Sequence, residues 1–280
     1  MRPAISPLPV LVAVGLLAIV LAVAVGGVSE PTVRARPVDG WRAGPVERPL
    51  DRLPRHPDVR RAREFAATRG ERVSFAVVDS RGRVHGLRAD VPFQSASVTK
   101  ALLLAAYLDR VGEAPLDAAT RARLTAMITY SDNDAADAVY AAGGDAGLEA
   151  VARRTGMRDF RPAGFWSEAW VTARDMAWFM RRLEHRALAG PHRGFAMRLL
   201  AGVVPEQRWG IPAAAGEDWS AWFKGGWRPS VGGQLVHQAA LLRGGGRKLA
   251  IAVLTDAQPS HEYGTETVRG IAARLLGSGG

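Results

Sequence analysis

The first residues that could do chemistry together are Ser97 and Lys100, three positions apart in the segment FQSASVTK (93–100). An apolar run at 101–108 follows at once and predicts a buried helix. Residues three apart on a helix share a face, so the hydroxyl and the ammonium would be neighbours. A desolvated lysine with a lowered pKa can take the proton of a serine and make it a nucleophile. The alternative is that Ser97 only caps the helix.

Lysine is rare in this chain, which gives Lys100 more weight. Of the 37 basic residues only Lys100, Lys224 and Lys248 are lysines. Arginine stays protonated in proteins and cannot replace a lysine that must lose its proton.

The net charge of +10 favours anionic surroundings such as lipid head groups or envelope polymers. The arginines are scattered and no nucleic-acid-binding signature accompanies them, so we expect no nucleic-acid partner.

Residues 1–28 predict a membrane anchor or a signal segment. An uncharged apolar stretch at 8–28, broken only by Pro9, is long enough for a bilayer-spanning helix of about 20 residues. The small residues Ala22 and Ala24 offer a signal-peptidase site as the alternative. We expect either a single-pass protein of the cell membrane with an extracytoplasmic catalytic domain, or a secreted protein if residues 1–24 are cleaved.

The remaining chain divides into a linker and one domain. Residues 29–57 contain six prolines among mixed charges, which is typical of a flexible tether. The folded domain is expected at 58–280, where strand patterns near both ends enclose a helical stretch at 118–200. This order predicts an α/β (α+β) sandwich, with an antiparallel sheet flanked by helices and an inserted all-helical lobe. Because the chain has no cysteine, packing alone must stabilise the domain.

Two further polar clusters follow the serine segment. Ser131, Asp132 and Asn133 interrupt the helical stretch, and in a tight extended turn Ser131 and Asn133 would point the same way. Helix capping is the alternative interpretation. Lys224 then precedes two glycines on a predicted strand, where a ligand could lie flat against the backbone. A bulge or corner of the sheet would also explain those glycines.

Together these clusters resemble a known signature. Ser-x-x-Lys, Ser-Asp-Asn and Lys-(Thr/Gly)-Gly, in this order, are typical of the serine β-lactamase and penicillin-binding-protein superfamily. Over about 58–276 the chain is most similar to class A β-lactamase-like serine hydrolases. The resemblance implies that fold and acyl-enzyme chemistry on a β-lactam or related amide, with no metal or organic cofactor. The alternatives are a D,D-peptidase or penicillin-binding enzyme acting on peptidoglycan-like peptides, and a non-catalytic wall-peptide-binding module. We expect a monomer.

The resemblance also implies a role for each matching residue. Ser97 would attack a carbonyl, Lys100 would take or hold its proton, and Ser131 would relay a proton to the leaving nitrogen. Lys224 would attract a substrate carboxylate, and the backbone amides of Ser97 and Trp227 would hold the oxyanion. The implied substrate-binding set is Asn133, Gly225, Gly226 and Trp227.

Three features depart from the class A pattern. Ser131 follows Ser97 by only 34 positions, so part of the helical lobe or its hairpin is missing. Gly225 replaces the usual threonine and removes a hydroxyl that would help to hold a carboxylate. The loop that carries the deacylating glutamate is shortened, which leaves Glu168 either as a relocated base or as a solvated loop residue. Without such a base, hydrolysis of the acyl-enzyme would be slow.

A Ser-His-Asp triad is a weaker hypothesis. It would need a histidine, and His237 lies on a predicted strand with apolar neighbours, where a hydrogen-bonded structural histidine is more common. The tryptophans around Lys224, among them Trp209 and Trp227, could line a groove, although core packing is the more common role for such side chains.

Overall fold

The computed structural model of this chain describes residues 57–188 and 190–277. The predicted anchor or signal segment at 1–28, and all but the last residue of the predicted linker at 29–57, lie outside the described residues. Among the helices that are described, none is long and apolar enough to cross a bilayer.

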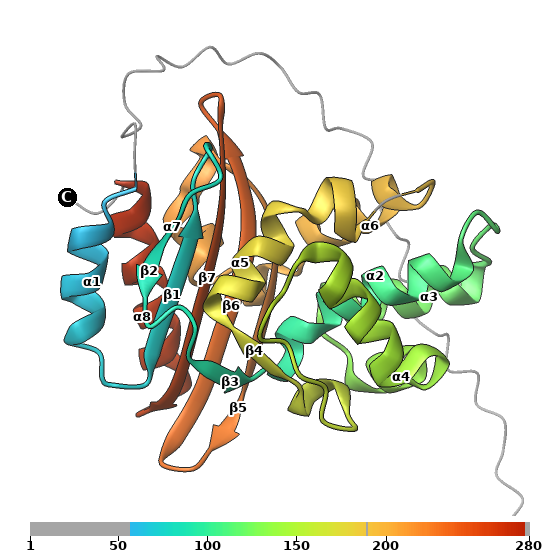
Figure 1. Cartoon of the computed structure of the whole chain (residues 1–280), viewed down its shortest axis with the longest axis horizontal. Coiled ribbons are helices and arrows are strands. Elements are labelled where there is room, and N and C mark those ends of the chain that lie inside the picture. The colour runs from blue at the N-terminus through green and yellow to red at the C-terminus, as the bar shows by residue number, and fades with distance from the viewer. Residues whose placement is uncertain (1–56, 189, 278–280) are drawn as a thin grey trace, which may run out of the picture. The chain divides into compact units, whose positions relative to one another are not determined.

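The centre of the structure is a five-stranded antiparallel sheet, which brings strands from both ends of the described chain side by side (Figure 1). From one edge to the other, the strands are β2 (Val84–Leu87), β1 (Val73–Val78), β7 (Arg247–Gln258), β6 (Gly233–Gly244) and β5 (Ser220–Ser230). Every residue of β1 is buried, which is the pattern of a strand covered on both faces. The strand that carries Lys224, β5, lies at the edge of the sheet.

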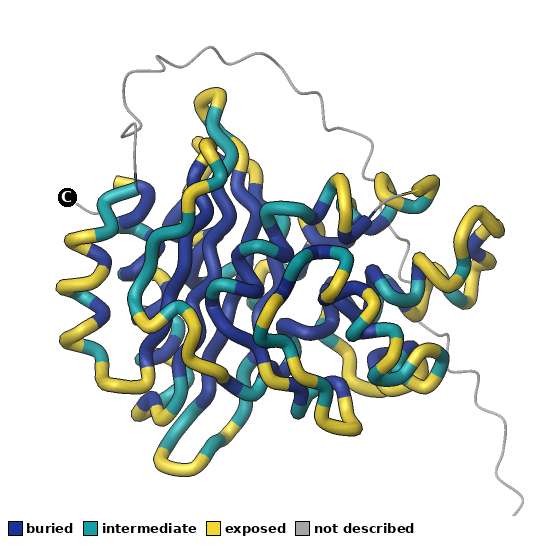
Figure 2. Tube along the Cα trace, in the orientation of Figure 1, coloured by how far each residue is buried: buried dark blue, intermediate teal, exposed yellow. Residues whose placement is uncertain are grey.

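Helices cover both faces of this sheet, and Figure 2 shows the strands buried between them. One face packs against α1 (Val59–Ala67), α7 (Ile211–Ala215) and α8 (His261–Leu276). Side chains alternate between the faces of a strand. Leu249, Ile251 and Val253 of β7 therefore face these helices, whereas the small Ala250 and Ala252 face the opposite layer.

The opposite layer contains the helical lobe. Its helices are α2 (Lys100–Val111), α3 (Ala118–Thr125), α4 (Asn133–Thr155), α5 (Ala173–Arg181) and α6 (Arg193–Ala201). Helix α5 lies against the sheet, and α2 packs against α4 with most of its side chains buried. Helix α4 is kinked at Gly144, which has a φ of +55°. This architecture confirms the predicted sheet with flanking helices and an inserted helical lobe.

Short elements connect the lobe to the sheet. Strands β3 (Pro92–Gln94) and β4 (Trp170–Thr172) form a small antiparallel pair that the sequence did not predict. A 3₁₀ turn, here the Ser97 turn (Ala96–Thr99), follows β3 with one intervening residue, and another, the Trp166 turn (Trp166–Glu168), comes just before β4. The pairing of β3 with β4 therefore brings these two turns close together. The remaining single turns are Ala126–Tyr130, Leu183–Ala187, Pro205–Gln207 and Gly216–Asp218.

Candidate active site

Ser97 lies in the Ser97 turn, directly before α2. The turn starts at Ala96, whose φ of +44° is uncommon for a residue with a Cβ atom. Thr99 occupies the N-cap position of α2, and the side chain of Ser97 caps neither the turn nor the helix. Within the described chain the Ser97 hydroxyl has no hydrogen-bond partner. The capping interpretation of Ser97 is therefore wrong, and its hydroxyl is free for a substrate.

Lys100 begins α2 and is completely buried. Its Nζ atom donates hydrogen bonds to the backbone oxygen of Ser131 at 2.5 Å and to Oδ1 of Asn133 at 2.7 Å. Burial lowers the pKa of Lys100 to about 8, although the charges of Asp132 and Asp137 partly oppose this shift. A lysine with this pKa loses its proton far more readily near neutral pH than an ordinary lysine does.

Ser131 links two lysines. Its backbone has left-handed angles (φ 61°, ψ 31°), and its Oγ atom lies 2.9 Å from Nζ of Lys224 and 3.4 Å from Nζ of Lys100. Asp132 turns away and caps α4 by accepting the amide of Ala135 at 2.7 Å. As expected, Ser131 and Asn133 point the same way, since both contact Lys100. The alternative interpretation, helix capping, holds for Asp132 alone.

Lys224 is also completely buried, on β5. Besides Ser131 Oγ, its Nζ atom contacts the backbone oxygen of Gly225 at 2.8 Å, and no carboxylate in the described chain pairs with it. Burial lowers the pKa of Lys224 well below its ordinary value, and the charge of Lys100 adds to the effect. Two positive charges beside one hydroxyl repel each other. Protonation of both lysines is therefore less favourable than protonation of only one of them.

The two glycines after Lys224 have separate structural reasons. A Cβ atom at Gly226 would lie 2.7 Å from the backbone nitrogen of Ser97, so only glycine lets β5 approach the Ser97 turn this closely. A Cβ atom at Gly225 would lie 3.2 Å from the ring of Trp209. Trp209 thus leaves little room for the threonine that is usual at this position. The ring of Trp209 packs against that of Trp227, with 5.9 Å between the ring centroids.

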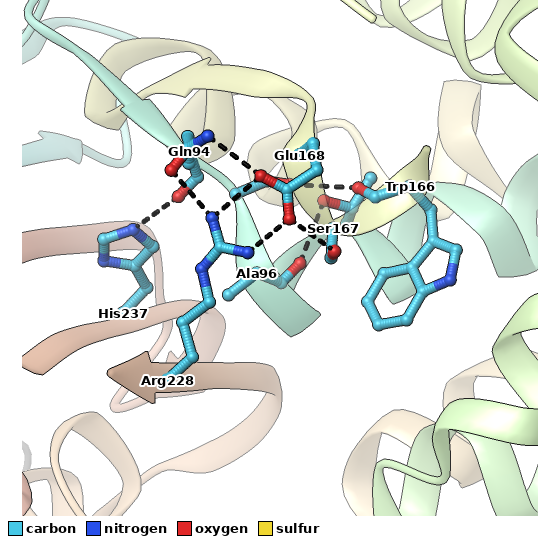
Figure 3. Close-up of polar contacts among 9 residues, drawn as sticks. Gln94, Ala96, Trp166, Ser167, Glu168, Arg228 and His237 are labelled. Carbon is cyan, nitrogen blue, oxygen red and sulfur yellow. Dashed lines mark hydrogen bonds and ion pairs between the residues drawn. The ribbon is translucent and has the colours of Figure 1, made fainter. Parts of the chain in front are cut away.

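Glu168 is not free: it belongs to an ion pair, although 36% of its side chain remains exposed. The Arg228 guanidinium donates to both of its carboxylate oxygens, and Gln94 Nε2 donates to Oε2 at 2.9 Å (Figure 3). The hydrogen bond from Arg228 is the main reason why the pKa of Glu168 is lowered. Neither oxygen is hydrogen-bonded to Ser97 or Lys100. Glu168 is therefore a partly exposed loop residue that is held in an ion pair, and its role as a relocated base stays a prediction.

Sequence reasoning missed Trp166, because an aromatic residue in a loop without periodicity gives no signal. Its ring centroid lies 4.6 Å from Nζ of Lys100, and its indole N–H donates to Oδ1 of Asp137 at 2.7 Å. In the described chain no carboxylate is hydrogen-bonded to Ser97, Lys100 or Ser131. Among all residues that the structure describes, no group of three or more His, Asp or Glu side chains could hold a metal ion.

His237 is structural, as expected. It is completely buried, its Nε2 atom lies 2.9 Å from the backbone oxygen of Gln94, and its Nδ1 atom accepts the amide of Thr255 at 3.1 Å. Burial lowers the pKa of His237 to about 4. Both nitrogens of a neutral ring are thus used by the backbone, and the histidine fixes β3 to β6 rather than serving a triad.

Comparisons with known proteins bear on the family of this chain. Residues 119–278 match a family model described as the Beta-lactamase enzyme family, a range that includes Ser131 and Lys224 but begins after Ser97 and Lys100. Comparison with the curated proteins finds no match.

Solved structures share the fold. An ancestral class A β-lactamase (GNCA) is 24% identical with a TM-score of 0.66, and the match covers 79% of this chain and 99% of that one. A β-lactamase from Chitinophaga pinensis DSM 2588 is 16% identical with a TM-score of 0.69, covering 80% and 99%. One from Sphaerobacter thermophilus DSM 20745 is 22% identical with a TM-score of 0.66, covering 79% and 96%. Since the family model matches more than half of the sequence, the chain belongs to the Beta-lactamase enzyme family, a family of serine hydrolases.

Proposed function

We propose that this enzyme forms an acyl-enzyme at Ser97 with a β-lactam or a related amide, and that the acyl-enzyme decays slowly. The observation that carries the proposal is the pair of buried lysines that share the Ser131 hydroxyl beside the Ser97 turn. Burial lowers the pKa of both lysines, which makes a neutral amine available as a base near neutral pH.

Acylation follows from these positions. A substrate carboxylate near Lys224 would favour its protonated form, and the resulting charge would keep Lys100 neutral. Lys100 then takes the proton of Ser97 as the serine oxygen bonds to the carbonyl carbon. The oxyanion is held by the backbone amides of Ser97 and Trp227. Ser131 gives its proton to the leaving nitrogen as the carbon–nitrogen bond breaks, and it recovers a proton from Lys100.

Deacylation lacks comparable assistance. Trp166, which covers Lys100, has no basic group, and Glu168 is held ionised by Arg228 with both oxygens occupied. A positioned general base typically contributes about 10²–10⁴ in rate.

Slow release of the acyl group also suits the second candidate, a D,D-peptidase or penicillin-binding enzyme of peptidoglycan metabolism. A purely binding module is disfavoured, since binding alone needs no buried lysine with a lowered pKa. The apolar segment at 8–28 supports an extracytoplasmic location.

The test is covalent labelling of the purified chain with a fluorescent penicillin, followed by intact mass spectrometry. We expect one adduct on Ser97 that persists for many times the acylation time, and no adduct on a Ser97→Ala variant. Rapid loss of the adduct with continued turnover would identify an efficient β-lactamase. A long-lived adduct, together with cleavage of a peptidoglycan-like peptide, would identify the peptidase. Absence of any adduct would reject the proposal.

A further inference from the structure

Two segments flank the Ser97 turn. On one side β5 places Lys224 beside Ser131 and Gly226 against the backbone of Ser97. On the other side the Trp166 turn places an indole ring over Lys100. A substrate that reaches Ser97 must therefore lie between β5 and the Trp166 turn.

The direction of a substrate in this space follows from the proposed function, on which the present inference rests. The leaving nitrogen is expected near Ser131 and the substrate carboxylate near Lys224. The acyl side chain must then extend the opposite way along β5, past Gly226. Alternate side chains of a strand point to the same side, so the next residue that it meets is Arg228.

Arg228 closes this end of the space through a bridge with Glu168 and Gln94. Its guanidinium donates to both oxygens of Glu168, and its NH2 group also donates to Oε1 of Gln94 at 2.7 Å. Gln94 completes the cycle through its hydrogen bond to Glu168. The bridge joins β5, the Trp166 turn and β3 in Figure 3. A bidentate arginine–carboxylate pair has a fixed geometry and resists displacement better than a single hydrogen bond.

A pocket of about 520 Å³ lies next to the bridge, and none of Ser97, Lys100 and Ser131 lines it. Arg228 and Gln94 form part of its wall, and Trp170, Pro229 and Leu235 contribute apolar surface. Its other charged side chains, Arg72 and Asp256, pair with each other at 2.9 Å. These walls fit an apolar or aromatic group better than a charged one.

We propose that the bridge of Arg228, Glu168 and Gln94 determines substrate size. When the bridge is closed, it restricts the enzyme to substrates whose acyl side chain ends short of Arg228. When it is open, the pocket behind it joins the site and accepts an aromatic acyl side chain. Arg228 is thus a specificity-determining residue.

The experiment measures the second-order rate constant for acylation of Ser97 by two penicillins. One has a short aliphatic side chain and the other has a side chain of two aromatic rings. The quantity compared is the ratio of the bulky to the compact rate constant. Arg228→Ala and Glu168→Ala open the bridge from opposite sides, and each should raise this ratio at least about tenfold. Because the two variants are independent, loss of folding in one leaves the other as the test.

The matched control is Arg60→Ala, which breaks an exposed arginine–glutamate pair on α1 without touching the bridge or the pocket and should leave the ratio at its wild-type value. Adding Trp170→Ala to Arg228→Ala should lower the ratio again, because the wall that receives the aromatic group is lost. If the compact penicillin acylates every variant while the ratio stays constant, the inference is overturned and the proposed function stands. If neither penicillin acylates the wild type, both fail.

Discussion

The pH dependence of acylation tests the role of Lys100 most directly. With a pKa of about 8, roughly a tenth of the Lys100 side chains are neutral at pH 7. An ordinary lysine, with a pKa of 10.5, would be neutral in only about 0.03% of molecules at that pH. Burial therefore raises the population of the base about 300-fold at pH 7.

The direction of the pH dependence is set by the protonation state of Lys100 that reacts. At saturating substrate, whose carboxylate keeps Lys224 protonated, neutral Lys100 is the base, so the acylation rate should rise with pH and level off above the apparent pKa. Between pH 7 and pH 9 the neutral fraction, and with it the rate constant, should increase about tenfold. The two lysines share Ser131, so the measured pKa belongs to the pair.

The assay is stopped-flow acylation by a chromogenic cephalosporin from about pH 6 to about pH 9.5. Lys100→Arg should be slow at every pH, because arginine keeps its proton. Lys248 pairs with Glu184 at 2.8 Å and belongs to no part of the site, so Lys248→Arg should keep the wild-type profile. A rate that is flat or falls between pH 7 and pH 9 would refute the assignment. So would a Lys100→Arg variant that acylates near the wild-type rate.

Three further outcomes are expected. Ser97→Ala should abolish labelling while its melting temperature stays within a few degrees of wild type, since polar surface substitutions usually change stability by less than about 0.5 kcal/mol. Glu168→Gln should change the slow release of bound penicillin little; a fast steady state that this substitution removes would instead identify Glu168 as the deacylation base. His237, with a folded pKa of about 4 against an ordinary value of 6.5, contributes stability above pH 6.5 that is lost as the pH falls toward 4. Urea titrations should show a loss of about 2 kcal/mol at pH 5 that His237→Gln lacks; equal losses in both proteins would contradict it.

Elements with strong periodic patterns could be predicted from the sequence. Strand β1 is a short apolar run, VSFAVV, and α8 follows Ser260, a typical N-cap residue whose hydroxyl accepts the amide of Tyr263. Ser97, Lys100, Ser131 and Lys224 could also be identified as candidates, because each lies within a short motif. These signals are local: a few neighbouring residues determine a cap, a strand or a motif.

Elements without such patterns could not be predicted. Strands β3 and β4 have three residues each, too few to show an alternation, and they pair across 78 positions between Phe93 and Val171. Helix ends are also weakly determined by local signals: α1 ends at Ala67, three residues before Gly70, the nearest glycine that could end it.

The surroundings of the catalytic groups were decided only by the tertiary structure. Arg228 meets Glu168 across 60 positions and Gln94 across 134, and Trp166 reaches Lys100 from a different turn. No local pattern records such contacts, because they depend on how the edge strand, the small sheet and the lobe pack together. The sequence by itself therefore indicated which groups are candidates for the reaction. Packing decided the burial that lowers their pKa values, the ion pair that occupies Glu168, and the side chain that covers Lys100.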